Sequence, residues 1–361
     1  MGKPDKPHIR VVFVCQQCGK ESLRWLGRCP NCQQWNTFVE TAVTAPTASR
    51  SISPVSPPQE LSQVVLEAAD RFSLPLTEFS RVLGGGVVAG SLALIGGEPG
   101  IGKSTLLLQV SALVAQARGK VVYVSGEETL RQIKLRSERL GVTGENLYLL
   151  AETNIEVILN QIEELSPSMV VVDSIQTVYH SELEGAPGSI SQVRECTLRL
   201  MRWAKLSAVP VFIAGHVTKD GAIAGPRVLE HIVDVVLYLE GEPFSAYRLL
   251  RCVKNRYGST NEVGVFEMKG EGLIEVDNPS QVFLSRRGGE TVGSAVVPTL
   301  EGSRPLLVEI QALTNPTSFG LPRRTANGVD FGRLLLIVAV LARRVGLKLG
   351  NQDVIANVAG G

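Results

Sequence analysis

The sequence lacks a long apolar run. Its longest, residues 334–342, holds nine apolar residues, whereas a helix that crosses a bilayer needs about 20. The apolar stretch near the N-terminus, residues 11–14, is too short for the core of a signal peptide, and no small-residue cleavage site follows it. We therefore expect no membrane-spanning segment and no secretion signal, and a cytoplasmic protein.

The sequence also lacks an excess of charge of either sign, because its net charge is +1. This total does not indicate a nucleic-acid partner. The distribution is uneven, with seven Lys/Arg against three Asp/Glu in residues 1–50 and six against two in residues 315–361. Two basic ends fit a solvated surface as well as an anionic partner.

Cysteine is scarce as well, at six in 361 residues. Cys196 and Cys252 stand alone in apolar surroundings, as small buried hydrophobes do. A long chain without a secretion signal is not expected to carry a disulfide framework.

With 44% hydrophobic and 20% charged residues, the composition is that of a globular protein. At about 150 residues per domain, the length predicts two or three domains.

The other four cysteines form two close pairs. Each C-x2-C pair lets a tight turn aim both sulfurs at one point, and two pairs ten residues apart supply the four thiolates of a tetrahedral zinc site. The few large apolar side chains nearby cannot close a core alone, so metal binding must supply folding free energy, on the order of 10 kcal/mol. A redox dithiol pair is the alternative, but the βαβ context is missing. The sequence predicts a zinc ribbon in residues 1–40, held by Cys15, Cys18, Cys29 and Cys32.

Residues 41–58 are dominated by Thr, Ala, Ser and Pro without periodicity. Such a composition predicts a semi-extended linker. Residues 59–273 then form the expected main domain, and residues 274–361 the last one.

A glycine-rich segment with the pattern G-x4-G-K-[ST] follows the short apolar run of residues 92–95 and precedes an amphipathic stretch, residues 105–118. Strand, loop and helix are the context in which this pattern cradles phosphate, with backbone N–H groups around the oxygens at a positive helix end. We expect Lys103 to reach the β- and γ-phosphates of a nucleoside triphosphate and the Ser104 hydroxyl to bind Mg²⁺. The predicted loop residues are Gly97, Glu98, Pro99, Gly100, Ile101, Gly102, Lys103 and Ser104.

Carboxylates lie at or just after the ends of two further β-branched runs. Asp173 closes residues 169–173, which read as a buried parallel strand that delivers it to the carboxyl edge of a sheet, where it can hold Mg²⁺ through water. Glu127 and its neighbour Glu128 follow the strand of residues 121–125. We choose Glu127 to polarise the attacking water. The alternatives are a helix-capping role for Asp173 and helix-dipole partners for the two glutamates.

A fourth strand, residues 209–214, precedes His216, which could sense the γ-phosphate or be structural. Residues 220–227 look like a mobile loop. Further strands are expected at residues 233–239, 247–253 and 264–268, with residues 261–266 returning in a hairpin. The fold class is therefore α/β, a mainly parallel sheet with helices on both faces.

The segment KNRYG, residues 254–258, follows one of these strands. Lys254 and Arg256 are two residues apart on extended backbone and so point to the same side. They could be surface charges. In a ring they could instead reach a neighbour's ATP as arginine-finger-type groups, an effect worth roughly 10³–10⁵ in rate.

Together, the four-cysteine ribbon, GEPGIGKST, VSGEE, VVVDSIQT, GHVTK and KNRYG resemble the bacterial RadA (Sms) family, from Cys15 onward. The resemblance implies a RecA-like P-loop ATPase core, a homo-hexameric ring with ATP at subunit boundaries, and binding of single-stranded and branched DNA. It implies helicase-like branch migration of recombination intermediates beside RecA in DNA repair. It also adds Thr105 to the nucleotide contacts, has Lys254 and Arg256 act across the subunit interface, and puts Lys219 and Arg227 in a DNA-facing loop.

The last domain resembles the family's Lon-protease-like module, a partial α+β domain here. Residues 293–314 fit its early strands and residues 321–350 a strand-helix segment. The chain ends at Gly361, before the region where a peptidase would keep its Ser-Lys pair, so the resemblance implies an incomplete module. Candidate DNA contacts in this segment are Arg323, Arg324, Arg333, Arg343 and Arg344.

Two other function classes remain open. A Lon-like ATP-dependent protease would need the Ser-Lys pair that this sequence does not contain. A KaiC-like signalling ATPase that switches by autophosphorylation would share the phosphate-binding loop, but it fits the zinc ribbon and KNRYG poorly.

Overall fold

The computed structural model describes residues 9–44, 59–64, 71–216, 229–241, 246–281, 292–301, 303–317 and 321–358. The chain divides into two compact units, Met1–Glu275 and Val276–Gly361, and each is described by itself. Within the described ranges, no helix has both the length and the apolar character that a membrane crossing requires.

The N-terminal segment is a three-stranded antiparallel sheet in the order β2-β1-β3. Cys15 at the end of β1 packs with Cys29 and Phe38 in a core of three buried residues. The pairing of β1 with β3 continues to Ile9 and Thr44, so residues 41–44 belong to this sheet and not to the linker predicted to begin there. The strands are β1 (Ile9–Cys15), β2 (Glu21–Ser22) and β3 (Phe38–Thr44).

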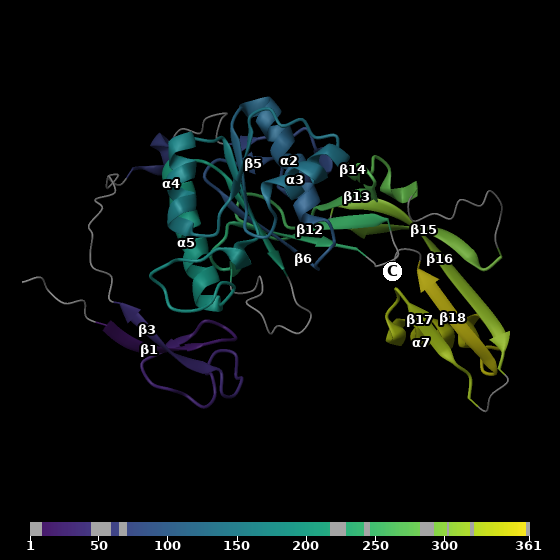
Figure 1. Ribbon diagram of the computed structural model, residues 1–361. Coiled ribbons are helices and arrows are strands. Elements are labelled where there is room, and N and C mark those ends of the chain that lie inside the picture. Colours follow the sequence, from purple (N-terminus) through teal and green to yellow (C-terminus); the bar gives the residue numbers. More distant parts are fainter. Residues whose placement is uncertain are drawn as a thin grey trace, which may run out of the picture. The chain divides into compact units, whose positions relative to one another are not determined.

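A nine-stranded sheet forms the centre of the first unit (Figure 1), in the order β14-β13-β12-β11-β6-β10-β9-β7-β8. The six strands from β11 to β8 pair in parallel, whereas β12, β13 and β14 add an antiparallel edge. The expected hairpin between β12 and β13 is present. The strands are β6 (Leu92–Gly97), β7 (Val121–Ser125), β8 (Leu147–Ala151), β9 (Met169–Asp173), β10 (Val211–His216), β11 (Val235–Glu240), β12 (Tyr247–Asn255), β13 (Val263–Lys269) and β14 (Gly272–Glu275).

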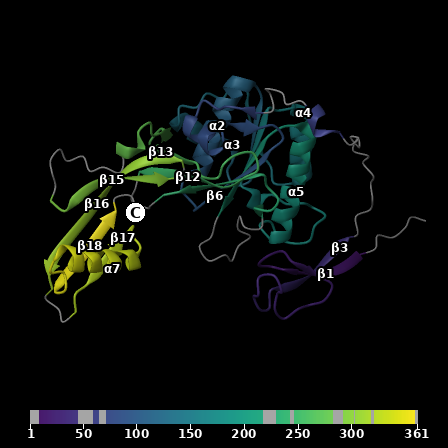
Figure 2. The same ribbon diagram turned by 180° about the vertical axis from the view of Figure 1, so that it is seen from behind.

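Helices cover both faces of this sheet, as Figures 1 and 2 show. Alternate residues of β6 make the two cores: Ala93 and Ile95 pack with α1, α2 and α3, while Leu92 and Leu94 pack with α4 and α5. Alternation of this kind is what a strand buried on both faces requires. The predicted α/β architecture is therefore confirmed. The helices are α1 (Thr77–Val82), α2 (Lys103–Arg118), α3 (Leu130–Arg139), α4 (Ile155–Leu165) and α5 (Ile190–Ser207).

Short elements complete this unit. Strands β4 and β5 form a separate antiparallel pair. Local caps fix two helix starts: Thr129 and Gln132 form a capping box on α3, and the Asn154 side chain accepts two N–H groups of α4. The elements are η1 (Leu61–Gln63), β4 (Arg71–Phe72), β5 (Val87–Val88) and η3 (Ile175–Thr177).

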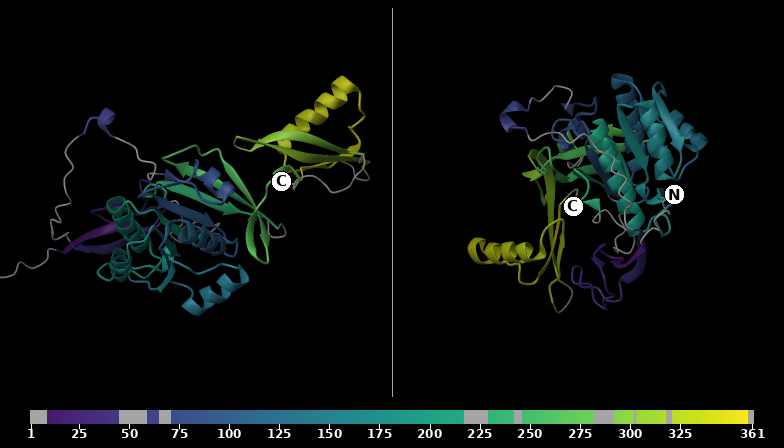
Figure 3. Two further views of the ribbon diagram at one scale, coloured as in Figure 1. Left: turned by 90° about the horizontal axis from the view of Figure 1, so that it is seen from above. Right: turned by 90° about the vertical axis from the view of Figure 1, so that its left-hand side faces the viewer.

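The second unit is a four-stranded sheet in the order β15-β16-β18-β17, with one helix against it (Figure 3). Leu334 of α7 is buried with Val354 and Ala356 of β18. The strand-helix segment expected in residues 321–350 corresponds to β17 and α7. The elements are η4 (Pro279–Gln281), β15 (Ser294–Glu301), β16 (Arg304–Pro316), β17 (Arg324–Asn327), α7 (Phe331–Val340), η5 (Leu341–Val345) and β18 (Gln352–Val358).

Candidate functional site

The glycine-rich loop joins β6 to α2, as the sequence predicts. Gly97 and Gly102 both have positive φ, which a residue with a side chain rarely adopts. A Cβ on Gly97 would lie 2.6 Å from the Leu239 carbonyl oxygen, and one on Gly102 would lie 2.6 Å from the Met268 methyl group. The loop is therefore packed against β11 and β13. At Gly100, by contrast, no heavy atom of the described residues other than its chain neighbours lies within 4 Å of the Cβ position, so the loop is open there.

Lys103 lies inside this loop. Its Nζ donates to the carbonyl oxygens of Gly97 and Glu98, both at 2.9 Å, and the residue is only 4% exposed. Burial lowers the pKa of Lys103, while the charges of Asp173 and Glu127 act to raise it. The amine thus has the two predicted carboxylates as its charged neighbours.

Strand register brings these carboxylates to one edge of the sheet. Asp173 pairs with Ser125 across β7 and β9, while His216 pairs with Gly97 across β10 and β6. The backbone of His216 therefore lies beside the start of the phosphate-binding loop. Lys219 and Arg227 fall outside the described residues.

The two neighbouring glutamates have different partners. Glu127 is exposed, and its Oε1 accepts a hydrogen bond from the Ser174 hydroxyl at 2.5 Å. Glu128 pairs with Arg136 of α3 at 2.5 Å, and its backbone N–H donates to the Ser125 hydroxyl. Glu128 therefore links β7 to α3, whereas Glu127 is directed toward the residue that follows Asp173.

Tyr123 is a site residue that the sequence analysis missed. Its hydroxyl donates to Asp173 Oδ2 at 2.5 Å in the buried interior. Burial raises the pKa of Tyr123 well above its usual value, and the charge of Asp173 and the hydrogen bond raise it further. The phenol therefore stays a neutral donor that fixes the orientation of the carboxylate. The available signal was one polar aromatic residue between the valines of the strand VVYVS.

Arg248, near the start of β12, is a second such residue. Its Nε donates to the Ile101 carbonyl oxygen of the phosphate-binding loop at 3.2 Å. It reaches the loop because β12 begins at the same edge of the sheet at which β6 ends.

The KNRYG segment lies at the opposite edge of the sheet. Asn255 pairs with Val235, and Val235 pairs with Ala93 near the start of β6, whereas the phosphate-binding loop follows Gly97 at its end. Four strand residues cover about 13 Å. The structure thus places Lys254 and Arg256 apart from Lys103 of the same chain.

The residues of this segment are held by hydrogen bonds. Lys254 Nζ donates to the carbonyl oxygens of Glu230 and Val233, and burial together with the charge of Arg256 lowers its pKa. Arg256 contacts Asp234 through a guanidinium nitrogen at 3.4 Å. The Asn255 side chain donates to the Leu83 carbonyl oxygen at 3.2 Å.

The residues at the carboxyl edge fit ATP and Mg²⁺. Ser104 in the first turn of α2 and Asp173 on β9 supply hard oxygen ligands of the type that Mg²⁺ prefers. The start of α2 supplies backbone N–H groups for phosphate oxygens, beside the open side of the loop at Gly100.

The four paired cysteines come together as predicted. Their Sγ atoms all lie within 4.8 Å of one another, with Cys15 and Cys32 at 3.6 Å and Cys18 and Cys29 at 3.5 Å. Four thiolates around zinc at about 2.3 Å would be about 3.8 Å apart, so the set fits a tetrahedral zinc ion. Burial and then the neighbouring thiols raise the pKa of Cys32 to about 12. Burial also acts to raise the pKa of Cys15, but hydrogen bonds to Thr37 and to backbone groups outweigh it and lower that pKa to about 6.

Arg324 is the first residue of β17, and Arg323 directly precedes it. Arg324 donates to the carbonyl oxygens of Arg323, Leu349 and Gln352, so its guanidinium closes the turn before β18. Arg323 is exposed, and its backbone N–H donates to Asp353. Of the two residues, Arg323 is exposed and Arg324 is partly buried.

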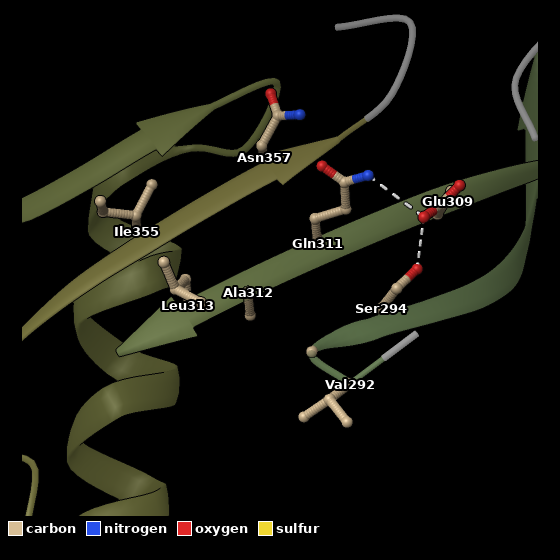
Figure 4. Close-up of a pocket in the computed structure, with 9 residues that line it drawn as sticks. Val292, Ser294, Glu309, Gln311, Ala312, Leu313, Ile355 and Asn357 are labelled. Carbon is tan, nitrogen blue, oxygen red and sulfur yellow. Dashed lines mark hydrogen bonds between the residues drawn. The ribbon is translucent and has the colours of Figure 1, made fainter. Parts of the chain in front are cut away.

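A pocket also lies on the sheet of the second unit (Figure 4). The buried Glu309 accepts hydrogen bonds from the Ser294 hydroxyl at 2.5 Å and from the Gln311 amide at 3.1 Å. The Ser294 contact joins β15 to β16, whereas Gln311 and Glu309 both lie on β16. The lining residues are Val292, Gly293, Ser294, Glu309, Gln311, Ala312, Leu313, Ile355 and Asn357.

Comparison with known proteins identifies two family matches. Residues 56–222 match the model of the AAA domain, and residues 13–40 match the rubredoxin metal binding domain. The chain is 56% identical to the DNA repair protein RadA of Bacillus subtilis, over 97% of this chain and 78% of that protein. It is 55% identical to the DNA repair protein RadA of Listeria monocytogenes, over 97% and 77%.

The solved structures that match have lower sequence identity. A KaiC-like protein of Pyrococcus horikoshii is 21% identical, with a TM-score of 0.48 over 57% of this chain and 98% of that chain. The flagellar accessory protein FlaH of Methanocaldococcus jannaschii is 17% identical, with a TM-score of 0.46 over the same shares.

Proposed function

The chain belongs to the bacterial RadA family of DNA repair proteins, and from this premise we propose that it is a DNA-dependent ATPase that drives helicase-like branch migration of recombination intermediates. The observation that supports ATP hydrolysis best is the buried amine of Lys103 with Asp173 and Glu127 as its charged neighbours. A phosphate-binding lysine beside two carboxylates of adjoining strands supplies both charge stabilisation and a base.

The residues have separate roles in this proposal. Residues 97–105 bind the phosphates. When the phosphates bind, the Lys103 amine donates to phosphate oxygens in place of the two loop carbonyl oxygens that it contacts here. Ser104 and Asp173 would hold Mg²⁺, which neutralises charge on the β- and γ-phosphates when bound. Glu127 accepts a proton from the attacking water, and the hydroxyl of Ser174 holds its carboxylate in place. His216 senses the γ-phosphate at the end of β10.

The cations of the KNRYG segment act on a neighbouring subunit. Their separation from the loop of their own chain supports this arrangement, because an edge about 13 Å away along the strands cannot supply a phosphate contact in the same subunit. Arg256, with 54% of its side chain exposed, stabilises the transition-state charge of ATP bound to the next subunit, and Lys254 supports the same boundary. A head-to-tail contact of this kind forms a ring where the rotation between subunits closes, and we propose that it closes as a hexamer.

The DNA contacts follow from family membership. We assign single-stranded and branched DNA as the substrate, RecA as the partner, and Lys219, Arg227 and Arg323 as contacts to the phosphate backbone. Arg324 is the weakest of the predicted contacts, because its guanidinium already donates to three carbonyl groups. The proposed domains are the zinc ribbon, which the pairing of β1 with β3 extends from residue 40 to Thr44, the ATPase core, which β14 extends from residue 273 to Glu275, and a Lon-protease-like module in the residues that follow.

An ATPase assay with and without single-stranded DNA tests this function. We expect DNA to raise the hydrolysis rate, and Lys103→Ala to abolish both the basal and the stimulated rate. Lys134→Ala is the matched control, since Lys134 forms an exposed pair with Glu138 within α3. A rate independent of DNA concentration would remove the motor assignment. The affinity for DNA should also fall with salt, by about 0.7 log units per tenfold increase in salt for each phosphate contact on a single strand.

A further inference from the structure

Asp234 is a buried carboxylate outside the nucleotide site. It directly precedes β11 and is only 1% exposed. Its Oδ2 accepts from the Leu92 N–H at 3.1 Å and from Lys205 Nζ at 2.7 Å, and its Oδ1 accepts from Arg256 at 3.4 Å. A carboxylate with this burial needs such donors to offset the cost of its removal from water.

The backbone of Asp234 repeats two of these links. Its N–H donates to the Leu92 carbonyl oxygen at 2.9 Å, and its carbonyl oxygen accepts from the Arg256 N–H at 3.1 Å. Asp234 is therefore joined by both its backbone and its side chain to the first residue of the strand that carries the phosphate-binding loop, and to Arg256.

The Arg256 side chain is anchored at Asp234. One guanidinium nitrogen contacts Asp234, and about half of the side chain is exposed. Lys254 differs, because its amine donates to two backbone carbonyl groups. Of the two cations in the segment, Arg256 is the one that can extend outward from a fixed anchor.

Lys205 of α5 shares the carboxylate. Burial acts to lower its pKa, but hydrogen bonds to Asp234 and to the Tyr257 hydroxyl outweigh this and raise it, so Lys205 remains a cation. If the Arg256 guanidinium turns toward a phosphate, Lys205 still neutralises Asp234. The cluster therefore contains a second positive charge. This charge lowers the free-energy cost of moving Arg256 away from the buried Asp234 carboxylate.

We propose that Asp234 is a positioning residue that aims Arg256 at the nucleotide of the neighbouring subunit, with Lys205 as the permanent counter-ion. This inference rests on the proposed cross-boundary role of Arg256. Asp234 itself touches no nucleotide, so its effect on turnover passes through Arg256 and leaves the nucleotide affinity of its own subunit unchanged.

A double-mutant cycle tests the proposal. Asp234→Asn preserves shape and an acceptor for the Leu92 N–H while it removes the charge. We expect it to lower kcat about tenfold or more, since a misplaced arginine finger forfeits part of an effect of roughly 10³–10⁵, and to leave ATP affinity within about twofold. Combined with Arg256→Ala, it should slow turnover no further than Arg256→Ala alone. Glu138→Gln, which removes an exposed carboxylate on α3, serves as the control.

The outcomes separate the inference from its premise. Normal turnover in Arg256→Ala would overturn the cross-boundary role itself. A slow Arg256→Ala with a normal Asp234→Asn would overturn only the positioning role, as would additive losses in the double variant. If Asp234→Asn does not fold by circular dichroism, the same cycle is run with Lys205→Met added, which removes the cation that the substitution leaves without its carboxylate.

Discussion

Tyr123 and Asp173 lie on neighbouring strands, 50 residues apart in the sequence, and share a buried hydrogen bond of 2.5 Å. The donor is a phenol whose pKa is raised by burial and by the carboxylate that it contacts. The residue that we assign to Mg²⁺ is therefore held in position by a neutral donor.

Removal of this phenol should impair catalysis more than folding. A buried hydrogen bond to a charged group is worth roughly 1.5 kcal/mol, or about tenfold in rate where it orients a reacting group. Tyr123→Phe should therefore lower kcat about tenfold and raise the Mg²⁺ concentration needed for half-maximal activity. Magnesium titrations of the ATPase rate measure both values, and an unchanged magnesium requirement would contradict the role given to Tyr123.

The same phenol predicts a dependence of stability on pH. Because the pKa of Tyr123 is higher in the folded state than in the unfolded state, its contribution is complete below pH 10 and is lost as pH rises above about 10, where the unfolded chain ionises first. The free energy of unfolding should thus fall more between pH 9 and 11 for the native protein than for Tyr123→Phe. Parallel slopes in urea denaturation at these pH values would be the contrary result.

The two neighbouring glutamates should separate in function. Glu127→Gln should lower ATP hydrolysis by roughly 10²–10⁴, the usual contribution of a general base, and leave ATP binding intact. Glu128→Gln should cost about 1 kcal/mol of stability, because it loses a partly exposed pair with Arg136, with hydrolysis reduced less than threefold. The comparison requires single-turnover hydrolysis, equilibrium ATP binding and thermal unfolding of both variants. The reverse pattern would transfer the catalytic role to Glu128.

Arg248 should matter for ATP affinity. Arg248→Met removes the donor to the Ile101 carbonyl oxygen, so the phosphate-binding loop should be less well ordered before ATP binds. We expect the Kd for ATP to rise about fivefold to tenfold, in line with roughly 1 kcal/mol for one hydrogen bond. Arg251→Met on the same strand, which loses a surface pair with Glu240, is the control. Equal affinities of the two variants would show that Arg248 does not support the loop.

Zinc should be needed for the folding of the ribbon and not for the folding of the ATPase core. Its core consists of Cys15, Cys29 and Phe38, which is too small to fold residues 9–44 without the metal. We expect about one zinc per chain in freshly purified protein, and Cys32→Ser should lose it while the melting transition of the ATPase core is kept. Cys196→Ser, at a buried cysteine of α5 outside the ribbon, should keep its zinc. Metal-free native protein would refute the zinc assignment.

The sequence was informative where the chemistry is local. The cysteine spacing, the glycine-rich loop and the strand that ends at Asp173 each lie within a short segment, so spacing and pattern located them. Tyr123, Arg248 and Asp234 could not be found in this way, because their partners are 50, 147 and 22 residues distant and meet only through the strand order. The position of KNRYG opposite the loop likewise depends on β12 running antiparallel to β11.

The most direct test of the account is the ATPase rate of mixed assemblies of Lys103→Ala and Arg256→Ala subunits, co-expressed and purified through two different tags. Each variant alone should be inactive, because one cannot bind the phosphates and the other lacks the cation. In mixed assemblies, an intact phosphate-binding loop of one subunit meets an intact Arg256 of the next, so we expect DNA-stimulated hydrolysis to return to a measurable fraction of the native rate. Mixed assemblies as inactive as either parent would contradict a nucleotide site shared between subunits.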